Sequence, residues 1–506
     1  MVKNKVVLVI LDGFGLGEED KQKNAIFAAN TPFFDQLFKQ HQFASLYASE
    51  EPVGILKNQF GNSELGHMTI GSGRTIENIN YKLNCLIDNN QMTEFLLAKP
   101  WIKEMIDNNE VIHLCGIYSA GSVHGNKKHI DALVDFFQSH HKKIALHLIS
   151  DGRDTSPRCF LSDLKDLKKH LLPSSKIVSV SGRYYAMDRD KNFDRTNQFY
   201  LAMNQANDTF INQTVEEYIE SQYQLGLDDE YIKPKSFINN DEYKITSTSP
   251  LIFTNYRADR IRQIIHCFKK STLFSTEFNF VDKNNVIGIC EYPNMPLSNI
   301  MIEKQVLTNT LGEILNRHKI KQLRIAETEK FAHVNFFFDG GVDVINQNQD
   351  KILINSLKVT SYDQCPEMSA EAITNTLVSK IADYDFILVN YANADMVGHT
   401  GNFLATKKAI EILDKQCSTL YNYLIDKYNG TLIITSDHGN ADFMVDSNSS
   451  IVKTHSIAKV PFIVLSNDYR LSKYSGSLQD VAPSILYLYD LDKPNEMTGS
   501  SLIIKK

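Results

Sequence analysis

Short runs of Val, Ile and Leu, separated by longer segments of helical character, constrain the fold of this chain more than any other feature. Such runs are typical of strands buried on both faces of a parallel sheet, so the sequence predicts an α/β fold. The clearest runs are Val6–Leu11, Ile144–Ser150, Ile177–Val180, Leu251–Tyr256, Phe386–Tyr391 and Leu432–Thr435. Helices are expected over Asp131–Ser139, Leu161–His170, Thr214–Leu225 and Thr406–Lys427.

The length of the chain indicates more than one folding unit. Its 506 residues are too many for one ordinary core, which favours two domains or one domain with a large insertion. Two stretches without strong periodicity lie near turn formers, at Gly71–Asn80 and Pro293–Asn299, and are predicted hinges. Residues 1–75 and 305–506 then form one discontinuous domain, and residues 80–300 form an inserted second domain.

Net charge, the N-terminal apolar run and cysteine usage limit the expected partners and the expected location of the protein. A net charge of −7 provides no overall basic field to attract nucleic acid or an anionic membrane, so any anionic ligand must be held by local clusters of Arg and Lys. The apolar run before Asp12 is too short for a signal peptide or a membrane span, which predicts a cytoplasmic location. The seven cysteines form no CxxC pair and indicate reduced thiols.

Carboxylate and imidazole side chains follow three of the predicted strands, and one further histidine precedes another strand. These residues are Asp12, Asp395, His399, Asp437, His438 and His455. Ligands of α/β proteins bind beyond the carboxyl ends of strands, and oxygen and nitrogen donors without thiolate suit Mn²⁺, Zn²⁺ or Mg²⁺. A lone Asp after a strand is more often a helix N-cap, and a lone His is more often structural, but three such strand ends together favour a two-metal site.

Ser63 is a candidate nucleophile in the glycine-flanked segment FGNSELGHMTIGSGR. A serine hydroxyl needs activation, and because no G-x-S-x-G motif of a serine hydrolase is present, a metal is the expected activator. The alternative is that Ser63 or Asn62 caps a helix, with Glu64 favourable in the first turn.

Arginines gather at predicted strand ends and loops in the middle of the chain. They are Arg153, Arg183, Arg189, Arg257 and Arg260, with Asp154 beside the first. Guanidinium groups bind phosphate and carboxylate in a bidentate manner, so the set predicts an anion site. His124 and Lys330 extend this set.

Together these motifs resemble those of the 2,3-bisphosphoglycerate-independent phosphoglycerate mutases, in the alkaline-phosphatase-like superfamily. The matching segments are LDGFG (11–15), GNSELGHMTIGSGR (61–74), SVHGNKKHI (122–130), SDGRDT (150–155), SGRYYAMDRD (181–190), YRADRIRQ (256–263), ETEKFAHVNFFFDGG (327–341), NADMVGHTG (393–401) and TSDHGNAD (435–442). The resemblance implies a phosphatase-like lobe formed by both chain ends and an inserted transferase lobe. It also implies a monomer that interconverts 3-phosphoglycerate and 2-phosphoglycerate in glycolysis and gluconeogenesis, without a bisphosphoglycerate cofactor.

The resemblance implies a role for each matching residue. Ser63 is expected to be phosphorylated transiently, Asp154 to act as acid or base, and Lys330 to take part in catalysis. One Mn²⁺ is implied at Asp12, Ser63, Asp437 and His438, and a second at Asp395, His399 and His455. Phosphoglycerate is implied to bind His124, Arg153, Asp154, Arg183, Arg189, Arg257, Arg260 and Lys330.

Two other classes of function are compatible with part of the sequence. A metal-dependent phosphatase or a phosphopentomutase would share the Asp and His residues, but the arginines of the middle segment argue against both. A catalytically silent metal- or anion-binding protein would lack a ligand or the nucleophile, and neither is missing. The chain departs from the family pattern at Gly125–Asn126 and in the segment SIAKVPF after His455, which leaves the loop conformations there open.

Overall fold

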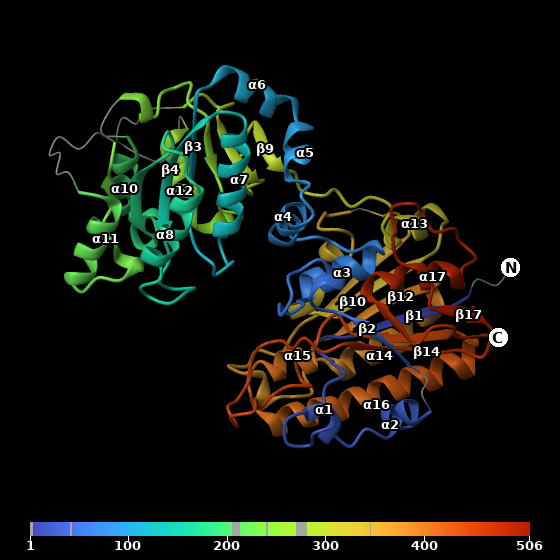
Figure 1. Cartoon of the computed structure of the whole chain (residues 1–506). Helices are drawn as coiled ribbons and strands as arrows, with labels where there is room; N and C mark the ends of the chain where they lie inside the picture. Colours follow the sequence, from blue (N-terminus) through green and yellow to red (C-terminus); the bar gives the residue numbers. More distant parts are fainter. Residues whose placement is uncertain (1–3, 41–42, 205–212, 239–240, 270–280, 345) are drawn as a thin grey trace. The chain divides into compact units, whose positions relative to one another are not determined.

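The computed structural model describes residues 4–506 apart from 41–42, 205–212, 239–240, 270–280 and 345. The chain forms two compact units, one of Met1–Asn78 with Val306–Lys506 and one of Ile79–Gln305 (Figure 1). All six predicted apolar runs form strands, so the predicted α/β class is confirmed. Among the described residues, no helix has the combination of length and apolar composition that a bilayer crossing requires.

The first unit contains a mixed sheet in the order β11-β10-β12-β1-β13-β14-β2-β16. β11, β10, β12, β1 and β13 run parallel, whereas β14 is antiparallel to both of its neighbours. The strands are β1 (Val6–Leu11), β2 (Phe43–Tyr47), β10 (Gln322–Glu327), β11 (Gln349–Ile354), β12 (Phe386–Tyr391), β13 (Thr431–Thr435), β14 (Val460–Leu465) and β16 (Ser475–Ser477), with a separate pair β15 (Tyr469–Leu471) and β17 (Ile503–Lys505).

Helices cover both faces of this sheet, because successive residues of β1 point to opposite sides. Val6, Leu8 and Ile10 pack with α3, α13 and α17, whereas the alternate residues pack with α2, α14 and α16 (Figure 1). The helices of this unit are α1 (Ala25–Ala28), α2 (Pro32–Lys39), α3 (Ser63–Ser72), α13 (Leu311–Arg317), α14 (Ala370–Lys380), α15 (Asn393–Gly398), α16 (Phe403–Tyr428) and α17 (Val481–Leu488).

The second unit has its own sheet in the order β6-β5-β4-β3-β7-β8-β9, in which only the β5–β6 pair is antiparallel. Its strands are β3 (Val111–Ile117), β4 (Lys143–Ser150), β5 (Lys176–Gly182), β6 (Lys235–Ser236), β7 (Leu251–Phe253), β8 (Val286–Cys290) and β9 (Asn299–Ile302). Its helices are α4 (Ile79–Asp88), α5 (Met92–Leu97), α6 (Pro100–Asn108), α7 (Lys127–Ser139), α8 (Phe160–His170), α9 (Arg183–Ala186), α10 (Phe193–Asn204), α11 (Val215–Gln224) and α12 (Arg262–Phe268).

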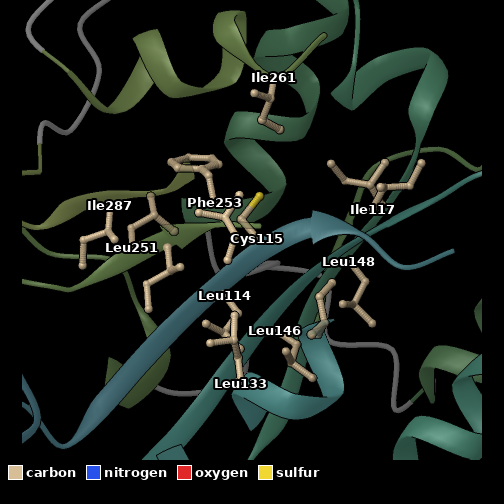
Figure 2. Packing of buried hydrophobic residues seen from close by; sticks show 14 of the residues in the cluster. Leu114, Cys115, Ile117, Leu133, Leu146, Leu148, Leu251, Phe253, Ile261 and Ile287 are labelled. Carbon is tan, nitrogen blue, oxygen red and sulfur yellow. The ribbon is translucent and has the colours of Figure 1, made fainter. Parts of the chain in front are cut away.

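The core of the second unit also fills both faces of its sheet. Figure 2 shows Leu133 of α7 beside Leu114 and Leu146, while Cys115 and Phe253 point toward Ile261 ahead of α12. This double burial explains why the strands of the unit are short continuous apolar runs rather than alternating ones.

Several predicted boundaries differ from the structure. The run Leu251–Tyr256 leaves the sheet after Phe253, because the Tyr256 amide donates to the His124 carbonyl instead of continuing the ladder. Helix α7 begins four residues before its predicted start, since the Asn126 side chain caps it. The expected hinge at Pro293–Asn299 lies inside the second unit, because β9 pairs with β8.

Candidate metal centre and arginine cluster

The candidate metal ligands lie at one edge of the first unit's sheet. Asp12 directly follows β1, Asp395 lies in α15 after β12, and Asp437 follows β13. Because these three strands are parallel neighbours, their carboxyl ends deliver the three carboxylates to one place. His455 enters from the loop ahead of β14, where its Nδ1 contacts the Gly61 carbonyl at 2.8 Å.

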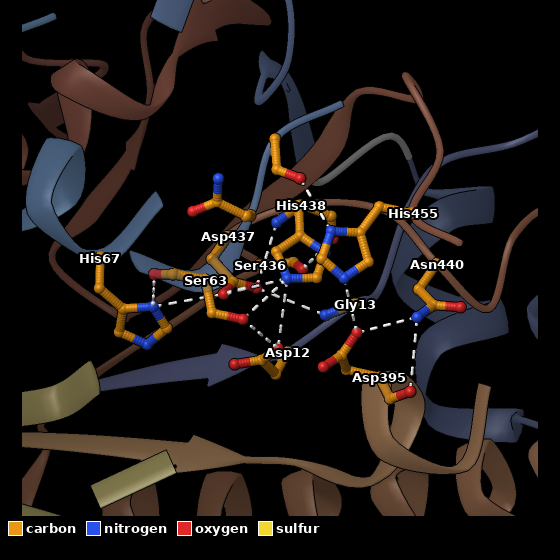
Figure 3. A network of polar contacts seen from close by, with 12 residues as sticks. Asp12, Gly13, Ser63, His67, Asp395, Ser436, Asp437, His438, Asn440 and His455 are labelled. Atoms are coloured by element: carbon orange, nitrogen blue, oxygen red, sulfur yellow. Dashed lines mark hydrogen bonds and ion pairs between the residues drawn. The ribbon is translucent and has the colours of Figure 1, made fainter. Parts of the chain in front are cut away.

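Ser63 is the first residue of α3 and faces these carboxylates. Its hydroxyl donates to Asp12 Oδ1 at 3.1 Å and lies 2.9 Å from His438 Nε2 (Figure 3). The Asn62 side chain caps the helix by accepting from the Leu65 amide. The capping alternative and the nucleophile hypothesis are therefore compatible, since Asn62 fills the cap and leaves the Ser63 hydroxyl for the site.

Close backbone approach at two glycines permits this geometry. Gly13 has a φ of +76°, and a Cβ atom there would lie 2.8 Å from Asp395 Cα. A Cβ atom on Gly66 would lie 2.7 Å from the Asp437 carbonyl oxygen. Only glycine therefore allows β1 to turn beside Asp395 and α3 to pack against Asp437.

Lys330 belongs to this centre. The sequence associated it with the arginines, but it ends a turn after β10 in the first unit and is buried. Its Nζ donates to Asp12 Oδ1 at 2.6 Å and Asp395 Oδ2 at 2.7 Å, and lies 2.9 Å from Ser63 Oγ. Burial acts to lower its pKa, but the Asp12 and Asp395 carboxylates outweigh that effect and raise it, so the ammonium stays charged.

A second group of ligand atoms surrounds Asp395. Its Oδ1 lies 3.2 Å from His399 Nε2 and 3.3 Å from His455 Nε2, and it accepts from Asn440 Nδ2 at 2.8 Å. The His455 ring also stacks on the His438 ring, with centroids 3.9 Å apart. This stacking joins the group at Asp395 to the group at Ser63.

The electrostatics of the centre are those of a cation site. Burial acts to lower the pKa of His438, but the Asp437 and Asp12 carboxylates outweigh it and raise the pKa to about 9. Burial acts to raise the pKa of Asp437, but the charge of His438 and the contact with His67 lower it. The hydrogen bond with Asp395 raises the pKa of His399. The raised pKa values of the two histidines and the lowered pKa of Asp437 all show that positive charge is favoured next to these carboxylates.

The residues present fit a divalent metal. Ligand atoms of Asp395, His399 and His455 lie within 4.8 Å of one another, and so do those of Asp12, Asp395 and His438. Asp437 Oδ2 is buried without a hydrogen-bond partner among the described residues, which leaves its lone pairs free for a cation. Oxygen and imidazole donors without sulfur match Mn²⁺, Zn²⁺ and Co²⁺.

Two buried residues of this centre were not in the predicted set. His67 Nδ1 lies 2.8 Å from the Ser63 carbonyl oxygen and 3.3 Å from Asp437 Oδ2. Asn390, within β12, donates to Asp12 Oδ2 at 2.8 Å. The sequence holds one signal for His67, its spacing four residues after Ser63 on a helix, and none for Asn390.

The arginines of the second unit follow β4, β5 and β7, and His124 follows β3, which lies between β4 and β7 in the sheet. Arg183 is buried and its Nη1 donates to Asp154 Oδ2 at 2.5 Å. Arg189 Nη1 and Arg257 Nε lie 3.6 Å and 3.3 Å from carboxylate oxygens of Asp259. Arg153, Arg189 and Arg257 are each about half exposed, so their guanidinium groups remain open to a ligand.

Positive charge dominates this cluster. Burial is the largest cause that lowers the pKa of Arg260, followed by the charges of Arg189 and Arg183. Burial and the charge of Arg183 also lower the pKa of His124, to about 4, so its imidazole is neutral at pH 7. A neutral imidazole among cationic arginines suits an anion that also needs a hydrogen bond.

Asp151 organises this cluster and was absent from the predicted set. Its Oδ1 accepts from Arg183 Nη1 at 2.6 Å and from the amides of Arg153 and Asp154, and its Oδ2 accepts from Ser119 Oγ. One buried carboxylate thus orients three predicted residues. Its position in SDGRDT, two residues before Arg153, was the available signal.

Comparisons with known proteins point to one family. The family model for the Metalloenzyme superfamily matches residues 4–493. The 2,3-bisphosphoglycerate-independent phosphoglycerate mutase of Ureaplasma urealyticum serovar 10 is 39% identical, over 100% of this chain and 99% of its own. That of Mycoplasma genitalium is 40% identical, over 99% of each chain. The fold is similar to a structure of Leishmania mexicana phosphoglycerate mutase at low cobalt concentration, with TM-score 0.61, 24% identity and coverage of 100% and 98%.

Proposed function

We propose a reaction for this chain, which belongs to the 2,3-bisphosphoglycerate-independent phosphoglycerate mutases of the Metalloenzyme superfamily. It interconverts 3-phosphoglycerate and 2-phosphoglycerate through a phosphoserine at Ser63. The observation that carries the proposal is the position of the Ser63 hydroxyl, within hydrogen-bond distance of Asp12, His438 and Lys330. The proposal includes action as a monomer in the cytoplasm on this small-molecule substrate.

The reaction consists of two transfers. In the first, Ser63 Oγ gives its proton to Asp12 and bonds to phosphorus, while the bond from phosphorus to the 3-oxygen breaks and Asp154, in its acid form, protonates that oxygen. In the second, the 2-hydroxyl of glycerate gives its proton to Asp154 and bonds to phosphorus, while the bond from phosphorus to Ser63 Oγ breaks and Oγ takes its proton back from Asp12. Both transfers need an oxygen whose negative charge is stabilised.

The residues around Ser63 supply that stabilisation. Asp12 Oδ1 accepts the hydroxyl proton, and the Lys330 ammonium lies where charge develops on Oγ. Ser63 also begins α3, a ten-residue helix whose first amide groups favour a phosphoryl group at this end. These groups are fixed before the reaction begins, so little reorganisation is needed.

Two Mn²⁺ ions are the proposed cofactor. Asp12, Ser63, Asp437 and His438 would hold one, and Asp395, His399 and His455 would hold the other. When bound, the ions supply Lewis-acid stabilisation of the attacking and leaving oxygens and of the Ser63 alkoxide.

The arginine cluster is proposed to hold the substrate. Arg153, Arg189 and Arg257 present half-exposed guanidinium groups that suit the carboxylate and phosphate of phosphoglycerate. Asp154 is the proposed acid and base for the glycerate hydroxyls, because its carboxylate accepts from Arg183 and is held at the edge of the cluster. Retaining glycerate between the two transfers is what separates a mutase from a phosphatase.

One assay tests the proposal against a metal-dependent phosphatase. Chelator-stripped protein receives 3-phosphoglycerate with and without Mn²⁺ and without bisphosphoglycerate, and 2-phosphoglycerate and free phosphate are followed together. Mn²⁺-dependent 2-phosphoglycerate with little free phosphate is expected. Phosphate release without isomerisation would overturn the mutase assignment in favour of a phosphatase.

A further inference from the structure

His67 and Asn390 form a buried bridge beneath the candidate metal centre. Both side chains are fully buried, and Asn390 Nδ2 lies 3.1 Å from His67 Nε2. The bridge ends on two candidate ligands, because Asn390 donates to Asp12 Oδ2 and His67 Nδ1 lies 3.3 Å from Asp437 Oδ2. Figure 3 shows His67 on the side of Ser63 away from His455.

The chemistry of the contacts defines the orientation of both side chains. The Asn390 atom that faces the Asp12 carboxylate is the amide nitrogen, since an amide oxygen there would repel it. The second hydrogen of the same nitrogen then points to His67 Nε2, which must accept. The proton of the His67 ring is therefore on Nδ1, where it donates to the Ser63 carbonyl oxygen at 2.8 Å.

These contacts argue against His67 as a direct metal ligand. Its ring atoms lie within 4.8 Å of those of Asp12 and Asp437, as the atoms of a ligand would. Both ring nitrogens are nevertheless used, Nδ1 as a donor and Nε2 as an acceptor. Neither nitrogen keeps a lone pair free for a cation.

We propose that His67 and Asn390 are positioning residues beside the Asp12 and Asp437 carboxylates. Asn390 holds the Asp12 carboxylate, and His67, anchored on the Ser63 carbonyl, holds Asn390. The inference deepens the proposed function, because it assumes that these carboxylates bind the metal next to Ser63. Asn390 fixes the rotation of the Asp12 carboxylate, which leaves Oδ1 to face Ser63 and Lys330. Residues that hydrogen-bond to metal ligands in this way set the geometry and affinity of metal sites.

The burial of the Asn390 amide supports this role. Its Oδ1 is buried and has no hydrogen-bond partner among the described residues. A buried amide with half of its polar atoms unpaired is unfavourable compared with an apolar side chain of the same shape. Its presence within β12 is explained by the two hydrogen bonds that Nδ2 makes.

Two polar substitutions test the role of His67. The amide oxygen of Gln can occupy the place of Nε2 and accept from Asn390, whereas the amide of Asn reaches only the place of Nδ1, so only His67→Gln keeps the contact with Asn390. Metal-free protein is titrated with Mn²⁺, and the free ion is measured by electron paramagnetic resonance. We expect Mn²⁺ affinity within about threefold of wild type in His67→Gln and a loss of about 10- to 100-fold in His67→Asn.

A double-mutant cycle tests whether the two residues act as one bridge. Asn390→Leu alone is expected to weaken Mn²⁺ binding about as much as His67→Asn, and the double variant of His67→Asn with Asn390→Leu to lose little more than either. The control is His333→Asn, because the His333 ring packs 5.4 Å from His67 while its Nδ1 has no hydrogen-bond partner among the described residues.

The outcomes separate the inference from the proposed function. Equal Mn²⁺ affinity in His67→Asn and His67→Gln, or losses that simply add in the double variant, would overturn the positioning role. Failure of the wild-type protein to bind Mn²⁺ would instead overturn the proposed cofactor. With Mn²⁺ at saturation, His67→Asn is expected to lower kcat and leave KM unchanged, since neither residue of the bridge belongs to the arginine cluster.

Discussion

The Lys330 ammonium nitrogen lies 2.9 Å from the Ser63 hydroxyl oxygen, and both residues are buried. The same nitrogen contacts Asp12 and Asp395, each at less than 3 Å. Lys330 therefore neutralises two candidate ligands and lies directly beside the proposed nucleophile. This contact supports the proposed part of Lys330 in phosphoryl transfer at Ser63.

Replacement of Lys330 by Met is expected to lower kcat by about 10²- to 10³-fold, because charge on the Ser63 oxygen loses a buried cation. Steady-state kinetics with saturating Mn²⁺ measures the effect. Lys5→Met is the control, since among the described residues the Lys5 ammonium donates to backbone carbonyls, and Lys5 precedes β1 at the end of the strand away from Asp12. Activity of Lys330→Met near that of the control would remove Lys330 from the mechanism.

Ser63→Ala is expected to abolish isomerisation and the transfer of label from phosphate-labelled substrate to protein. Mn²⁺ binding should largely remain, because the carboxylates and imidazoles stay in place. Ser72→Ala, at the other end of α3, is the matched control and should keep its activity. Labelling of the Ser63→Ala protein would contradict a phosphoserine at this position.

Arg257→Ala is expected to raise the ratio of phosphate release to isomerisation, or to abolish both reactions. The Arg257 guanidinium contacts Asp259 through Nε, but about half of the side chain is exposed. Its other nitrogens can therefore hold the carboxylate of glycerate. Arg158→Ala serves as the comparison, because Arg158 lies over the Tyr223 ring and donates to its carbonyl. Unchanged isomerisation in Arg257→Ala would exclude Arg257 from the substrate site.

Metal binding is expected to release protons at pH 7. In the metal-free protein the pKa of His438 is about 9, and a metal must displace its proton below that pH. Apparent Mn²⁺ affinity should therefore rise between pH 7 and 9, by up to about tenfold per pH unit for each proton released. Calorimetry in buffers of different ionisation enthalpy counts the protons, and equal affinities at pH 7 and 9 would contradict this prediction.

The structure predicts that protons compete with the metal up to a higher pH than the sequence alone predicts. An ordinary histidine titrates near pH 6.5, so the sequence predicts a steep loss of activity below about that value. The carboxylates around His438 extend proton competition to higher pH, and this effect arises only after folding brings Asp12 and Asp437 to the ring.

Arg324→Met is expected to destabilise the protein by about 3–5 kcal/mol, because it leaves Asp339 buried without its charged partner. Arg324 Nη2 lies 3.6 Å from Asp339 Oδ1, and both side chains are fully buried. Urea unfolding measures the loss, with Arg317→Met on the exposed side of α13 as control. The double variant Arg324→Met with Asp339→Leu should recover most of the loss, and no recovery would argue against the ion pair.

Hydrophobic pattern alone was sufficient to predict the central strands of both units. Val6–Leu11 and Phe386–Tyr391 match β1 and β12 residue for residue, because strands buried on both faces consist almost wholly of apolar residues. The strands β6 (Lys235–Ser236) and β16 (Ser475–Ser477) were not predicted. They are two and three residues long and largely polar, so pairing with a neighbour, rather than composition, makes them strands.

The side chains at strand ends were also accessible from sequence, since a polar residue directly after an apolar run is a local signal. The sequence thus determined that Asp12, Asp395 and Asp437 meet at one sheet edge, while their roles as metal ligands stay predictions. Only the tertiary structure placed Lys330 beside Ser63, and joined His67 through Asn390 to Asp12. Each of these contacts joins residues separated by more than 260 positions, so packing of the whole unit, and no local pattern, decides them.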